Sequence, residues 1–164
     1  MRLILGSGSS RASASLPWMT PPVFAGLPWL ASHPYAYPAL EMLHIVGIAL
    51  LLGNLVLLEL RVWGLAPELP LQPLARLSIG LALSGFALTG LSGLLMFAAD
   101  PGGMLASRTF VIKMGLVMLA GLNAAMFHAR GGLRQVDTTA KLQTVVSLGL
   151  WLTVIICGRW IAYA

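Results

Sequence analysis

The chain has 164 residues, of which 58% are hydrophobic and 9% are charged, and its mean hydropathy is +0.87. Soluble domains carry about 25% charged residues, so a water-soluble fold could not cover this chain with polar surface and a bilayer is the expected solvent. The formal charge of +5 does not indicate nucleic-acid binding. The basic residues flank apolar runs, as they do where Lys and Arg set the orientation of a membrane protein.

Two segments precede the first long apolar run. Residues 1–19 include the polar stretch "GSGSSRASAS", which predicts a disordered or mis-assigned tail with Met19 as the true start. The stretch "LIL" after Arg2 is too short for the apolar region of a signal peptide. Residues 20–38 combine prolines with Trp and Tyr, a composition that predicts a segment lying at the membrane interface.

Four apolar segments then follow, each long enough to cross a bilayer as a helix, which takes about 20 residues. They cover approximately 39–60, 77–99, 109–129 and 142–164. Prolines separate the first two, and "DPGG" at 100–103 predicts a turn between the second and third. The expected fold is all-α, with residues 39–164 forming a four-helix transmembrane bundle.

The basic residues fall unevenly in the connections between these helices. The first and third connections, which share one side of the membrane, contain Arg61, Arg76, Arg130, Arg134 and Lys141. Lys and Arg favour the cytoplasmic side, so we expect a multi-pass protein of the bacterial inner membrane with both termini external.

Small residues at helical spacing predict close packing between helices. Gly85, Thr89 and Gly93 repeat at every fourth position in the second helix, and Gly121 and Ala125 do so in the third. The single cysteine, Cys157, lies in an apolar run and is expected to pack in the core.

A rise of about 1.5 Å per residue converts sequence position into depth, and polar residues then fall into three layers. The outer layer is a predicted cluster of Glu41, His44, Lys113 and Arg159, with Met96 at a similar depth. The middle layer contains Asn54, Asn123 and Ser84, and the inner layer contains Glu59, Arg61 and His128. Ionisable groups in a bilayer usually face the bundle interior or a partner, so the cations are expected to stabilise Glu41 and His44.

Haem b is one chemistry that the outer layer suggests. His44 and His128 are roughly 20 Å apart at the helical rise, so one iron cannot take both. His44 with Met96, or alone, remains an axial-ligand candidate, and Lys113 and Arg159 would pair with the propionates. A structural or ion-paired histidine is the favoured alternative.

Quinone, an anionic lipid head group and copper are the other ligands considered. Basic pockets between helices bind lipid head groups, and Met and His are ligands for Cu(I), although the methionines form no Met-rich loop. Nucleotide-binding and hydrolase motifs are absent from the sequence.

Four stretches of the chain together resemble a family of small bacterial four-helix membrane proteins of unknown function. They are "LHIVGIALLLGNLVLLELRVWGLA" at 43–66, "LTGLSGLLMF" at 88–97, "FVIKMGLVMLAGLNAAMFH" at 110–128 and "SLGLWLTVIICGRWIAY" at 147–163. The resemblance implies four helices over 39–164, with Glu59 where that family has Asp. More distantly, the chain is similar to copper-resistance D-type and cytochrome b561-type membrane proteins, an analogy at the level of the fold.

The sequence therefore predicts an accessory or ligand-binding membrane protein rather than an enzyme. It would interact with the lipid bilayer and with a membrane-protein partner or a second copy of itself. The alternatives are a b-type haem or quinone electron-transfer protein and a copper or small-solute permease.

Overall fold

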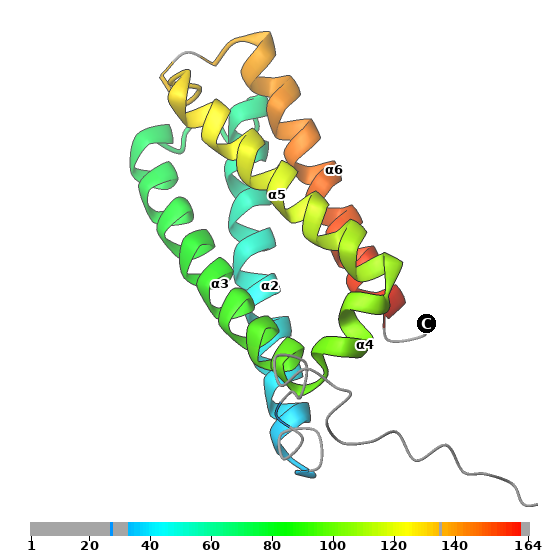
Figure 1. Ribbon diagram of the computed structural model, residues 1–164. Helices are drawn as coiled ribbons and strands as arrows, with labels where there is room; N and C mark the ends of the chain where they lie inside the picture. Colours follow the sequence, from blue (N-terminus) through cyan, green and yellow to red (C-terminus); the bar gives the residue numbers. More distant parts are fainter. Residues whose placement is uncertain (1–26, 28–32, 135, 162–164) are drawn as a thin grey trace, which may run out of the picture.

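The computed structural model describes residue 27, residues 33–134 and residues 136–161, and these are helical with short connections (Figure 1). The long helices are α2 (Ala36–Trp63), α3 (Leu71–Ala99), α5 (Arg108–Ala129) and α6 (Thr138–Ile161). All four are long and apolar enough to cross a membrane. The predicted all-α fold with four candidate membrane spans is confirmed. The predicted tail and most of the interfacial segment lie outside the described residues.

Proline positions explain why α3 begins before the predicted residue 77. Pro70 is the N-cap of α3, with φ −67° and ψ 119°, and Pro73 lies in its first turn. Backbone N–H groups in a first turn have no partner within the helix, so the missing donor of proline costs nothing there. Pro38 occupies the equivalent first turn of α2.

The predicted turn at 100–103 is instead the start of a short helix, α4 (Pro101–Ala106). The Asp100 side chain caps it by accepting a hydrogen bond from the backbone N–H of Gly103 at 2.9 Å. Pro101 at the first helical position completes a favourable helix start. A sequence of Asp, Pro and Gly satisfies a helix N-terminus as well as a turn, which is why the prediction was wrong.

The long helices form two antiparallel pairs, α2 with α3 and α5 with α6, and α2 also packs on α6 (Figure 1). The first pair is very close: a Cβ added to Gly47 would lie 2.9 Å from the Gly85 carbonyl oxygen. Gly93 packs closely against the ring of His44. The predicted packing role of the α3 stripe is therefore confirmed. Gly121 and Ala125 of α5 are exposed, so their predicted packing role within this chain is wrong.

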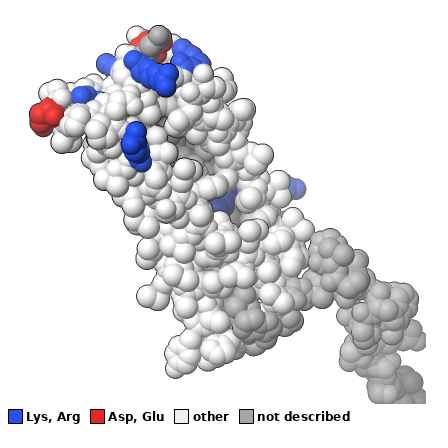
Figure 2. Space-filling view, turned by 90° about the vertical axis from the view of Figure 1, so that its left-hand side faces the viewer, with Lys and Arg blue, Asp and Glu red and all other residues white. Residues whose placement is uncertain are grey.

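Charged side chains gather at one end of the bundle (Figure 2). This end contains the end of α2, the start of α3, the α5–α6 connection and the start of α6. The five basic residues of the two predicted cytoplasmic connections lie there, and we call it the basic end. Within the α5–α6 connection, Arg130 forms an ion pair with Asp137 at 3.4 Å.

Candidate functional site

His44 of α2 is half-buried against α3. Its Nδ1 lies 3.1 Å from the hydroxyl oxygen of Ser92, which itself donates to the carbonyl oxygen of Leu88 at 2.7 Å. A serine hydroxyl has one hydrogen to donate, and when that hydrogen goes to Leu88, Nδ1–H of His44 is the donor in the contact with Ser92. In that tautomer of the neutral imidazole, Nε2 carries the lone pair, and the backbone of Thr89 is a further hydrogen-bond neighbour of the ring.

Lys113 approaches the same layer from α5. Its ammonium group lies within electrostatic range of His44 and of Cys157. Gly158 of α6 leaves room for it, because a Cβ there would lie 3.4 Å from the lysine Nζ. His44, Ser92 and Lys113, contributed by three helices and flanked by α6, are called the polar site below.

The other members of the predicted outer cluster lie at the edge of the polar site. Glu41 is exposed on α2, and both Glu41 and Asp100 lie within electrostatic range of Tyr37. Glu41 forms no ion pair with Lys113 among the described residues. Arg159 is exposed near the end of α6, and Met96 is partly buried one helical turn beyond Ser92. The structure thus places Lys113 within electrostatic range of His44 but does not form the expected carboxylate–lysine pair among the described residues.

The predicted inner layer does not converge. Arg61 donates to the carbonyl oxygens of Leu69 at 2.8 Å and Pro67 at 3.1 Å, so it orders the α2–α3 connection. The Nδ1 of His128 contacts the carbonyl oxygen of Ala124 at 2.9 Å on its own helix. These short-range bonds use each polar group locally, without a shared inner site.

Glu59 has a different environment from the other members of its layer. It is 3% exposed, and its Oε2 has no hydrogen-bond partner among the described residues. Ser147 of α6 is the polar neighbour of this carboxyl group. Ser78 of α3 is 1% exposed, and its hydroxyl is also unpartnered there. Two buried polar groups therefore face the inside of the bundle.

The predicted middle layer forms one hydrogen bond between helices. Asn123 donates to the carbonyl oxygen of Gln143 on α6 at 3.0 Å. Asn54 donates to the carbonyl oxygen of Leu50 at 2.8 Å, and Ser84 donates to the carbonyl oxygen of Gly80 at 3.0 Å. Each of these bonds lies within one helix. The rotation of each helix about its axis decides which of these side chains bond to another helix. An amide that faces away from the neighbouring helix can bond only to the backbone of its own helix.

Ser92, Ser78 and Ser147 were missed by the sequence interpretation. Ser92 is adjacent to Gly93 in the small-residue stripe, so its place on the α2-facing side of α3 was available as a signal. The stripe was interpreted as packing alone. Small polar residues on such a face both allow close approach and hydrogen-bond across it.

Comparison with models of protein families, with curated proteins and with solved structures gives no match for this chain.

Proposed function

We propose that this chain is a multi-pass protein of the bacterial inner membrane that binds a ligand or a membrane-protein partner at the polar site. The observation that supports the proposal is the contact between His44 and Ser92, with Lys113 of a third helix within electrostatic range of the imidazole. Ionisable groups are costly at this depth and are retained mostly where they serve a site. The resemblance to small bacterial four-helix membrane proteins belongs to the same proposal.

The polar site suits an oxygen-rich or anionic group. Lys113 supplies three N–H donors and a positive charge. His44 supplies Nε2, since Nδ1 is engaged with Ser92. A carboxylate or a phosphate offers complementary atoms to this pair.

A b-type haem or a quinone is the second candidate. The observation that favours it is the engagement of Nδ1 of His44 with Ser92, because histidines that bind a metal usually donate their other ring N–H to a fixed acceptor. Nε2 would be the axial ligand, and Lys113 would pair with a propionate. A copper or solute permease gains no comparable support: no three His, Cys, Asp or Glu side chains are grouped to hold an ion in the described part of the chain.

The test is the composition of protein purified in mild detergent from its own membranes. Absorbance spectra of oxidised and dithionite-reduced samples detect haem, mass spectrometry of an organic extract detects quinone, and gel analysis detects a co-purifying protein. We expect one of these components in the wild type, reduced at least about tenfold in His44→Ala, as for loss of a ligating group.

His128→Ala is the matched control, because His128 is an intramembrane histidine that bonds within its own helix. It should retain the bound component. Equal composition of the wild type, His44→Ala and His128→Ala in folded samples would contradict the proposal.

A further inference from the structure

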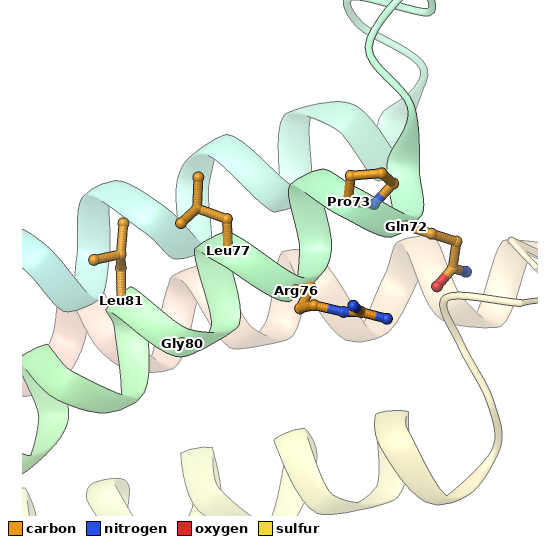
Figure 3. A pocket seen from close by; sticks show the side chains of 6 residues that line it. All are labelled: Gln72, Pro73, Arg76, Leu77, Gly80 and Leu81. Atoms are coloured by element: carbon orange, nitrogen blue, oxygen red, sulfur yellow. The ribbon is translucent and has the colours of Figure 1, made fainter.

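The outward face of α3 contains a groove near the basic end. Its volume is about 560 Å³, and it is lined by Gln72, Pro73, Arg76, Leu77, Gly80 and Leu81 (Figure 3). The opposite face of the helix, with buried Ala75, Ser78 and Ala82, packs on the bundle. In a membrane, the groove therefore opens toward lipid.

The groove is polar toward the start of α3 and apolar deeper along the helix. Gln72 and Arg76 project toward the side of α5, whereas Leu77 and Leu81 project away from it (Figure 3). Gly80 lies between these two sets and has no side chain to fill the floor. A Cβ added there would meet no atom within 4 Å. The groove therefore has a cationic end, formed by Gln72 and Arg76, and an apolar part over Gly80 between Leu77 and Leu81, which is called the trough below.

Arg76 forms no ion pair with any residue in the described part of the chain. Gln72 ties this region to the α5–α6 connection by donating to the Leu133 carbonyl oxygen at 3.2 Å. Arg134 and Lys141 add positive charge at the same end. An anion is the complementary occupant, and a guanidinium can bind a phosphate through two hydrogen bonds.

We propose that this groove binds an anionic phospholipid of the surrounding leaflet. Its phosphate lies on the Arg76 guanidinium, and one acyl chain lies over Gly80 between Leu77 and Leu81. A groove that opens toward hydrocarbon is reached from the bilayer, which favours an amphipathic occupant over a free anion. The proposal does not depend on the polar site, which is formed by different residues nearer the other end of the bundle.

Native mass spectrometry of the full chain in detergent, titrated with phosphatidylglycerol or phosphatidylcholine, tests the charge. We expect tighter binding of phosphatidylglycerol and a loss of about fivefold in Arg76→Gln, the effect of one basic residue near an anionic lipid. Lys141→Gln removes the same charge from the same end on α6 and should keep the preference. Equal affinity for both lipids, or equal losses in the two variants, would overturn the proposal.

A second pair of variants tests the trough with Arg76 intact. Gly80→Leu fills the groove, and Gly90→Leu makes the same change elsewhere on α3. Neither added Cβ meets an atom within 4 Å, so both variants should fold. Phosphatidylglycerol binding should fall severalfold in Gly80→Leu and stay at the wild-type level in Gly90→Leu. Identical binding by both variants would show that no acyl chain lies over Gly80.

Discussion

A buried carboxyl group among apolar helices is costly in its charged form, and Glu59 occupies such a position in α2. It is 3% exposed, and one of its oxygens has no hydrogen-bond partner among the described residues. The described structure places no basic side chain in an ion pair with it. Burial without a cationic partner makes its charge a destabilising feature.

Replacing Glu59 by Gln should therefore stabilise the bundle. The amide keeps the shape and a hydrogen-bonding oxygen for Ser147 but carries no charge, and we expect the free energy of unfolding to rise by about 1 kcal/mol. Thermal unfolding in detergent at pH 8 measures this change. Glu68→Gln, at an exposed position, is the control and should have no effect. A clear loss of stability in Glu59→Gln would mean that a bound cation or partner uses the carboxylate.

At the scale of helices, the contact between α2 and α3 depends on two glycines. A Cβ on Gly47 would lie 2.7 Å from the backbone nitrogen of Thr89, and one on Gly85 would lie 2.6 Å from the backbone nitrogen of Leu51. Backbone atoms cannot move aside as a flexible side chain can. The helices must separate if either glycine gains a side chain.

Gly47→Ala is accordingly expected to destabilise the protein by about 1–3 kcal/mol, the usual range for overpacking. Gly53→Ala is a matched control on the same helix, because its Cβ would meet no atom within 4 Å. Fluorescence-detected size-exclusion chromatography after heating measures both variants. Gly53→Ala should match the wild type or exceed it, since alanine favours helix over glycine. Equal behaviour of the two variants would show that the close crossing is unimportant for stability.

Sequence patterns predicted the four long helices because hydropathy over about 20 residues is a strong signal. They predicted helix ends less well, since Pro73 reads as a breaker although a first turn accepts it. They also predicted that His44 and Lys113 share a depth, and the structure places the two groups within electrostatic range of each other. The depth of a residue along its helix does not show toward which side of the helix its side chain faces. For that reason Glu41 and Asn54 face elsewhere than expected, and the burial of Glu59 beside Ser147 was not foreseen.

For the whole molecule, the distribution of charge has a consequence for orientation. The basic end contains the α2–α3 and α5–α6 connections, whereas α4 lies at the opposite end with the start of α2 (Figure 1). If the basic end is cytoplasmic, as Lys and Arg favour, α4 and the C-terminal end of α6 are external.

Cysteine labelling in spheroplasts checks this orientation. On a Cys157→Ser background, single cysteines replace Gly102 in α4 or Thr139 at the start of α6, both exposed positions. A membrane-impermeant maleimide should label position 102 in intact spheroplasts and position 139 only after their lysis. The reverse pattern would place the basic end outside.

The pairing of helices also bears on biogenesis. Each antiparallel pair crosses the bilayer twice and returns to the side from which it started, and each helix satisfies its own backbone hydrogen bonds in lipid. Insertion can therefore proceed as two separate events, with the halves docking afterwards along α2 and α6. A chain cleaved within α4 would leave two independently anchored halves. The two halves could be expressed from separate genes and assemble in the membrane. The protein would then serve as a template for split reporters of membrane assembly.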